Sequence, residues 1–158
     1  MGKLWKAGDK SIIINMFIGE YQHSIDIKKR LSLPAKFRKE LGRNVIVTRG
    51  FDSCLVIYTE KKWKGAMEEL RKLSTSKAEN RKLNRTILGG AIEVSLDKLG
   101  RILIPDYLKN YASLKKNVTI CGLSNKLEVW DSEKWESYRK KAELDIDKVA
   151  EGLPELGI

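Results

Sequence analysis

Polar and apolar residues alternate over two short stretches near the start of the chain, and a tight turn separates them. Residues 21–27 read "YQHSIDI" and residues 30–33 read "RLSL", and this period of two predicts two half-buried strands. Asp26 opens the intervening turn, because its side chain can accept a backbone N–H bond from two residues further on. Pro34 then forces Leu33 into an extended conformation and suits the first turn of a helix.

After these two stretches, apolar residues are spaced as in a short helix, and two further stretches are then typical of strands. Within "PAKFRKEL", Phe37 and Leu41 lie four positions apart, which predicts a short helix that ends at Gly42. The stretches "NVIVTRG" at 44–50 and "CLVIY" at 54–58 are rich in β-branched residues and predict two more strands joined by a turn. The unit is therefore strand, turn, strand, short helix, strand, strand.

The chain contains this unit twice. Aligning residues 21–64 with residues 92–136 pairs Asp26 with Asp97, Arg30 with Arg101, Pro34 with Pro105 and Trp63 with Trp135. Four short strands and one small helix bury little apolar surface, so each copy is expected to pack against the other. The sequence predicts an α+β fold, mainly β, with a pseudo-symmetric β core and flanking helices.

The pattern divides the chain into five segments. They are a leader outside the fold at 1–15, the first unit at 20–63, a helical linker at 64–90, the second unit at 91–134, and a C-terminal helix and tail at 135–158. Three helix starts are predicted from side chains that can cap an N-terminus: Thr59, Ser76 with Glu79, and Asp131. The aromatic residues in these helices are interpreted as core anchors.

Charge is uneven along the chain and favours a polyanionic partner. Lys and Arg number 31 against 21 Asp and Glu, a formal net charge of +10. Residues 16–88 hold 17 basic and 8 acidic residues, whereas residues 89–158 hold 11 and 12. Such an excess is typical of proteins that bind nucleic acid or an anionic membrane surface, although a solvated lysine-rich surface has the same composition.

The repeated Asp-x-x-x-Arg turns contain the candidate DNA contacts. Arginine can read a guanine edge with two parallel hydrogen bonds, so the arginine of each turn is the predicted base reader. The lysines are placed for phosphate contacts, and each aspartate would fix its turn and orient its arginine by a charge-assisted bond. The candidate residues are Asp26, Lys28, Lys29, Arg30, Asp97, Lys98 and Arg101.

A purely structural interpretation of these turns competes with DNA binding. An exposed Asp–Arg pair can simply lock a turn, and it then contributes about 0 to 1 kcal/mol. That interpretation is favoured for Arg101, whose turn contains one lysine and a glycine. The first turn has two lysines and is followed by three more cations, which favours DNA contact there: Lys36, Arg38 and Lys39.

Few residues suit catalysis or metal binding. Cys54 and Cys121 each lie inside an apolar run and His23 is the one histidine, so no disulfide scaffold, zinc site or Cys–His pair is expected. No phosphate-binding loop is present, and no run approaches the roughly 20 apolar residues of a membrane span. The sequence predicts a cytoplasmic protein that is not an enzyme and has no cofactor.

The two Asp-x-x-x-Arg turns, with "MFIGEYQHSID" before the first and "GRILIP" after the second, give the chain a resemblance to the MraZ family of bacterial transcription regulators. The likeness runs from Met16 to about Ala150 and includes "NVIVTRGFDSCLVIY" and "LEVWDSEKW". It implies two SpoVT/AbrB-like units with swapped-hairpin-like pairing that assemble into ring homo-oligomers. It also implies nucleoid association and binding of double-stranded DNA at repeated promoter sites of the division and cell-wall gene cluster. The family's motifs fall on both Asp–Arg pairs, and Lys29 stands where Gly or Asn often precedes the Arg.

Other functions remain open from the sequence. An oligomeric scaffold or antitoxin-like protein would use the basic first half to bind an acidic protein. An RNA-binding module would need exposed aromatic residues, which are not expected here. A helical face with Lys77, Arg81 and Arg85 is an alternative DNA reader, although an exposed linker helix explains the same spacing.

Overall fold

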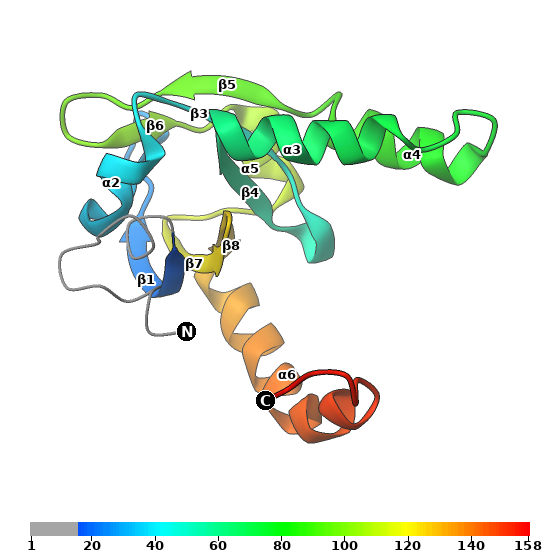
Figure 1. Cartoon of the computed structure of the whole chain (residues 1–158). Helices are drawn as coiled ribbons and strands as arrows, with labels where there is room; N and C mark the ends of the chain where they lie inside the picture. Colours follow the sequence, from blue (N-terminus) through cyan, green and yellow to red (C-terminus); the bar gives the residue numbers. More distant parts are fainter. Residues whose placement is uncertain (1–15) are drawn as a thin grey trace, which may run out of the picture.

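The structure is a computed structural model and describes residues 16–158 (Figure 1). These residues contain eight strands and five α-helices. The first unit comprises β1 (Phe17–Ser24), β2 (Arg30–Ser32), α2 (Ala35–Leu41), β3 (Asn44–Arg49) and β4 (Leu55–Thr59), with the short 3-10 helix η2 (Phe51–Ser53) before β4. The second comprises β5 (Ile92–Ser95), β6 (Arg101–Leu103), α5 (Asp106–Tyr111), β7 (Asn117–Ser124) and β8 (Leu127–Asp131). Helices α3 (Glu60–Arg71) and α4 (Ala78–Ile87) connect the units, and α6 (Ser132–Glu151) follows. The predicted order of elements is confirmed in both copies, and the predicted leader lies outside the described residues.

The two units exchange strands. The main sheet has the order β1-β7-β8-β4-β3-β5, so the first strand of each unit pairs with the third strand of the other, and every pairing is antiparallel. β2 and β6 pair with each other in a separate two-stranded ribbon. This arrangement confirms the α+β, mainly β class and the swapped-hairpin, pseudo-symmetric core.

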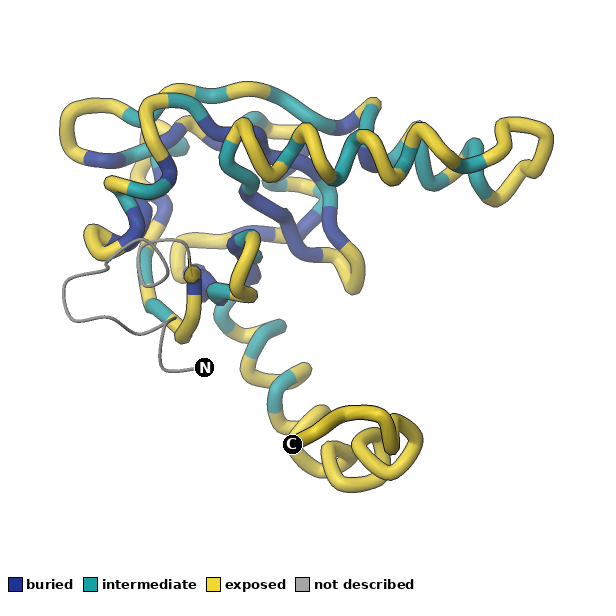
Figure 2. The backbone as a smooth tube through the Cα atoms, viewed as in Figure 1, coloured by how far each residue is buried: buried dark blue, intermediate teal, exposed yellow. Residues whose placement is uncertain are grey.

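One apolar core joins the two units. Leu31 of β2 lies opposite Ile102 of β6, and both side chains are buried against residues of the main sheet. Phe37 of α2 packs edge-on against two aromatic rings of β1, with ring centroids 5.1 Å from Phe17 and 5.2 Å from Tyr21. In Figure 2 the buried segments (dark blue) concentrate where these strands and helices meet. Neither copy could keep this core without the other.

Two of the three predicted helix caps are confirmed. The Thr59 hydroxyl accepts the backbone N–H of Lys62 at 3.1 Å, and the Asp131 carboxylate accepts that of Lys134 at 3.4 Å. Helix α6 then packs two aromatic side chains on Trp130, with ring centroids 5.4 Å away for Trp135 and 4.9 Å for Tyr138. Beyond this contact α6 extends away from the sheet, and its outer half is exposed (Figures 1 and 2).

The capping box predicted for Ser76 and Glu79 is wrong. Lys77 occupies the N-cap of α4 and no side chain caps it. The Ser76 hydroxyl instead lies 2.7 Å from that of Ser74, and the guanidinium of Arg81 donates to the carbonyl oxygens of Thr75 (2.9 Å) and Ser76 (3.1 Å). Side chains thus stabilise the turn before the helix rather than its first N–H groups.

The two cysteines are free and buried, as expected for small apolar residues. Burial raises the pKa of the Cys121 thiol to about 12, and it also raises that of Cys54. Both thiols are therefore protonated, and weak nucleophiles, at neutral pH.

Among residues 16–158 no helix combines the length and the apolar composition needed to cross a membrane.

Phe37→Ala is expected to lower the free energy of unfolding by about 3–5 kcal/mol, because it removes a ring that is 1% exposed and leaves a cavity between α2 and β1. Urea denaturation measures this loss. Phe51→Ala is the matched control, since that ring is 68% exposed and its removal should cost less than about 0.5 kcal/mol. Equal losses for the two variants would contradict this view of the core.

Candidate nucleic-acid interface

The first Asp-x-x-x-Arg turn is held by its aspartate. Asp26 Oδ1 accepts the backbone N–H groups of Lys28 and Arg30, each at 2.9 Å, and Oδ2 accepts Arg30 Nε at 2.8 Å. The backbone closes the loop as well, because the Asp26 N–H donates to Arg30 O and the Lys29 N–H donates to Asp26 O, both at 3.0 Å. A single carboxylate thus fixes both the turn and the direction of the arginine.

The second turn repeats this geometry atom for atom. Asp97 Oδ1 accepts the N–H groups of Leu99 and Arg101 at 2.9 Å, and Oδ2 accepts Arg101 Nε at 2.7 Å. The bond to the carboxylate uses only the inner guanidinium nitrogen, Nε, of each arginine, which leaves the two outer nitrogens available as donors. In residues 16–158 these outer nitrogens make no hydrogen bond, and the side chains of Arg30 and Arg101 are 32% and 25% exposed. Two parallel donors per arginine are what a guanine edge requires.

The β2–β6 ribbon brings the two arginines onto one face. Arg30 lies opposite Leu103, and Arg101 lies opposite Ser32, so the arginines occupy diagonal positions on the ribbon. Since Leu31 and Ile102 point into the core, the arginines share the outward face, with Cα atoms about 7–8 Å apart as is usual for diagonal neighbours. Two further bonds, Leu33 N to Gly100 O at 3.0 Å and Ile104 N to Lys29 O at 2.9 Å, extend the ribbon into both turns. The turns therefore form one unit and not two independent loops.

Hydrogen bonding keeps both aspartates ionised. The backbone N–H of Arg30 is the main cause that holds the pKa of Asp26 below its ordinary value; burial opposes it, and the guanidinium of Arg30 lowers the pKa further. The corresponding groups of Arg101 lower the pKa of Asp97. The charge-assisted bonds that orient the arginines therefore persist at neutral pH.

The lysines of the turns differ in their surroundings. Lys29 adopts a left-handed conformation, φ 64°, at the position where the second turn has Gly100, φ 74°, so both turns share one backbone shape. The Lys29 Nζ lies 2.6 Å from Asp106 Oδ1, and this contact is the main reason that the pKa of Asp106 is lowered. Lys28 and Lys98 are exposed and, in the described chain, form no ion pair. They remain better placed for phosphate contact than Lys29.

Sequence reasoning missed two kinds of residue near the turns. The tips carry exposed aliphatic side chains, since Ile27 is 99% exposed and Leu99 is 61% exposed. The sequence of the turns could have shown this, because both place an aliphatic residue next to a lysine: Ile27 before Lys28, and Leu99 after Lys98. It also missed a groove beside the first turn whose lysines come from the second unit: Lys109, Lys115 and Lys116.

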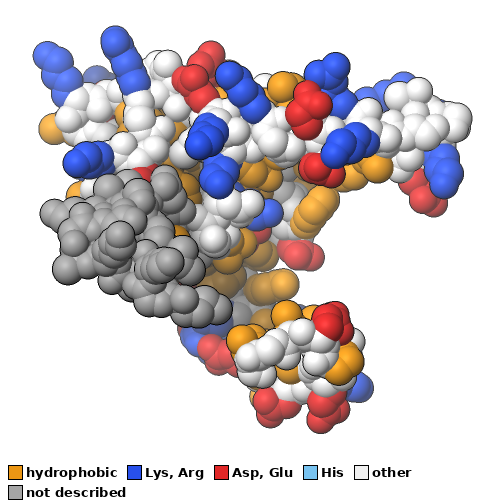
Figure 3. Space-filling view, viewed as in Figure 1, with side chains coloured by type: hydrophobic (Ala, Val, Ile, Leu, Met, Phe, Trp, Pro, Cys, Tyr) orange, Lys and Arg blue, Asp and Glu red, His pale blue; other side chains and the backbone are white. Residues whose placement is uncertain are grey.

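The alternative reader on α4 is less suitable for base recognition. Arg81 already donates from one outer nitrogen to two carbonyl oxygens of the preceding turn. Figure 3 shows Lys and Arg side chains distributed along the edge formed by β5 and the α3–α4 arm, with acidic side chains among them. This edge has mixed charge and lacks the repeated, oriented arginines of the ribbon.

A comparison with protein families matches each of the two units. The family model described as "MraZ protein, putative antitoxin-like" matches residues 16–86 and 87–153, once for each unit. The chain belongs to the MraZ family. MraZ relatives include proteins from Natranaerobius thermophilus (45% identical), Clostridium acetobutylicum (46%) and Acetivibrio thermocellus (46%), each named "Transcriptional regulator MraZ". Each alignment covers 143 residues, 90% of this chain and 100% of the relative. The resemblance inferred from the two turns is therefore confirmed at the level of the MraZ family.

Gly100→Ala is expected to destabilise the protein by about 1–2 kcal/mol, because an L side chain is disfavoured at this positive φ. The added Cβ would also lie 2.2 Å from Arg38 Nε and displace that side chain. Thermal or urea unfolding measures the loss.

Gly65→Ala is the control, since Gly65 lies within α3 with no atom near its added Cβ and should gain about 0.5–1 kcal/mol. A stabilising effect of Gly100→Ala would show that the second turn does not hold the conformation described.

Proposed function

We propose that this chain is a sequence-specific DNA-binding transcriptional regulator that acts on repeated promoter sites of the division and cell-wall gene cluster. The supporting observation is the pair of guanidinium groups, each held through Nε by an aspartate and sharing one face of the ribbon. The names of the relatives, all transcriptional regulators, support the same function. Such a role requires no cofactor and no enzymatic activity, and it places the protein in the cytoplasm on the nucleoid.

Each turn is suited to the major groove. The outer nitrogens of Arg30 and Arg101 would donate two hydrogen bonds to guanine O6 and N7, a contact that lysine cannot replace. The exposed aliphatic tips, Ile27 and Leu99, are suited to contact thymine methyl groups, and Lys28 and Lys98 to contact phosphates. Because the Asp–Arg bonds orient the arginines before DNA arrives, less side-chain entropy is lost on binding.

The proposal includes a ring homo-oligomer. Apolar side chains continue along α6 after its contact with the sheet and are exposed in this chain: Leu144, Ile146 and Val149. Among residues 16–158, β1 and β5 are the outer strands of the sheet, so each has an edge that no described strand pairs with. An assembly would cover these surfaces, and several turns acting on one duplex would bind repeated sites far more tightly than one turn alone.

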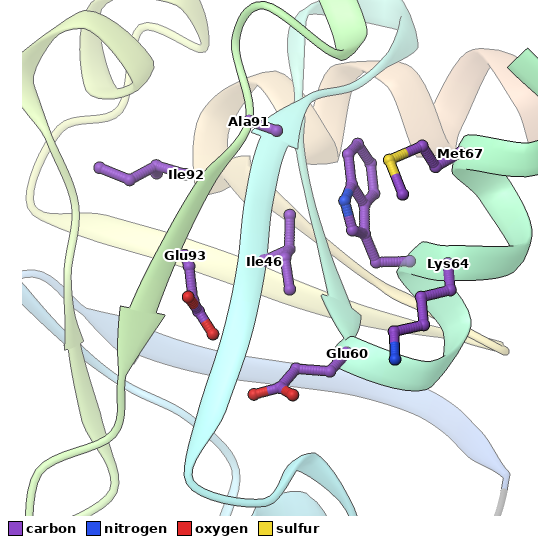
Figure 4. A pocket seen from close by; sticks show the side chains of 8 residues that line it. Ile46, Glu60, Lys64, Met67, Ala91, Ile92 and Glu93 are labelled. Atoms are coloured by element: carbon purple, nitrogen blue, oxygen red, sulfur yellow. The ribbon is translucent and has the colours of Figure 1, made fainter. Parts of the chain in front are cut away.

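A groove between α3 and the β3–β5 edge is a further surface that subunit contacts would cover (Figure 4). It encloses about 340 Å³, and Ile46, Ile92, Trp63 and Met67 contribute apolar side chains to it. Figure 4 shows the carboxylates of Glu60 and Glu93 and the amine of Lys64 near one end. An apolar groove with a charged end fits a protein segment better than DNA.

An antitoxin-like scaffold that binds an acidic protein is the second candidate, and the description of the matching family favours it. Such a protein would show salt-sensitive binding without preference for a DNA sequence. Labelled duplex from the region upstream of the chain's own gene, competed with a shuffled duplex of equal length, separates the two functions.

Arg30→Ala is expected to reduce affinity for that upstream duplex by about 1–3 kcal/mol and to weaken its preference over the shuffled duplex, while folding and assembly stay intact. Fluorescence anisotropy measures both affinities. Lys148→Ala, which removes one cation from the exposed outer part of α6, is the control and should leave the preference unchanged. Unchanged discrimination by a well-folded Arg30→Ala would eliminate Arg30 as a base reader.

A further inference from the structure

The groove beside the first turn combines residues from both halves of the chain. Its volume is about 540 Å³, and the lining residues are Ser24, Ile25, Asp26, Ile27, Lys109, Lys115 and Lys116. Strand exchange explains this composition, because β1 pairs with β7 and the residues before β7 therefore lie next to the residues that enter the turn. A backbone bond from Ile25 N–H to Lys116 O, 2.8 Å long, joins the two segments directly.

The groove is positively charged after its internal ion pairs are considered. Asp26 is the one carboxylate in its lining, and it already accepts three hydrogen bonds from its own turn, one of them from Arg30 Nε. Lys115 Nζ lies 3.5 Å from Glu133 Oε2, but these side chains are 71% and 85% exposed, so their attraction is weak. Lys109 and Lys116 form no ion pair with any residue from 16 to 158.

We propose that this groove binds backbone phosphates of the duplex whose bases meet Arg30, an inference that rests on the proposed function. Asp26 and Ile27 belong both to the wall of the groove and to the turn that ends at Arg30. A DNA backbone borders each groove that a reader enters, so cations beside the reader are positioned to meet phosphates. Lysines act there as point charges that need no fixed geometry.

Around the second turn, two cations instead of three occupy the corresponding positions, because Gly42 stands where the first turn has Lys115. The matching backbone bond, Leu96 N–H to Arg43 O at 2.8 Å, shows that Arg43 corresponds to Lys116, and the repeat places Arg38 at the position of Lys109. Arg38 Nε donates to Leu33 O at 3.0 Å, and its side chain packs over Gly100. The phosphate contacts should therefore be stronger at the first turn, even though its lysines belong to the less basic half of the chain.

The test uses the double variant Lys115→Gln/Lys116→Gln of the full chain. Affinities for the upstream duplex and for its shuffled counterpart are measured by anisotropy over a series of salt concentrations. Each lost phosphate contact reduces the magnitude of the negative slope of log K against log salt by roughly 0.9, so this magnitude should fall by about 1.8 for each subunit on the duplex, and both affinities should fall on the order of 10-fold or more. The ratio between the two duplexes should stay at the wild-type value. Lys140→Gln/Lys141→Gln on α6 removes the same charge from another exposed pair and should change neither slope nor ratio.

Three results would overturn or separate the proposals. If the double variant is folded, as its melting temperature shows, and still has the wild-type slope, the proposed phosphate groove is overturned. Lys109→Gln alone is measured in the same way, and a wild-type slope there has the same meaning. A change in assembly size by light scattering with an unchanged slope also overturns it, because the groove would then hold the acidic end of α6 from a second copy. Equal wild-type affinity for the two duplexes would instead contradict the proposed function itself.

Discussion

The antiparallel pairing of β2 with β6 is the interaction on which the rest of the structure depends. These two short strands place Leu31 against Ile102 in the core and direct Arg30 and Arg101 outward on the opposite face. The same ribbon continues into both turns through the carbonyl oxygens of Lys29 and Gly100. One strand register therefore determines both the packing of Leu31 and Ile102 in the core and the exposure of the two arginines. A shift of the register by one residue would bury the arginines and expose the core residues.

The aspartates add orientation to this framework. Each carboxylate accepts two backbone N–H groups and one arginine Nε. The conformational entropy of the turn and of the guanidinium is therefore lost during folding and not during binding. The two turns differ in what surrounds them and not in their backbone. The first has three lysines from the second unit beside it, whereas the second has two arginines from the first unit, Arg38 and Arg43, of which Arg38 packs over Gly100.

Periodicity and the internal repeat were sufficient to predict the strands, the helices and the Asp–Arg bonds. Asp26 and Arg30 lie four residues apart in one turn, so their contact depends on local sequence alone. Lys109, Lys115 and Lys116 were missed because their position depends on which strands pair. β1 pairs with β7, whose residues are distant in sequence: Gln22 lies opposite Thr119, 97 positions further along the chain. The Ser76 cap failed for a local reason, because the Ser76 hydroxyl lies 2.7 Å from that of Ser74 and Arg81 donates to the carbonyl oxygens of the same turn.

A structure of the assembled protein on a duplex with its upstream promoter repeats is the most direct test of the account. The outer nitrogens of Arg30 and Arg101 should lie within hydrogen-bond distance of guanine O6 and N7 in the major groove, while Asp26 and Asp97 still hold Nε. Guanidinium groups enclosed in contacts between subunits, with the DNA bound on another surface, would contradict it.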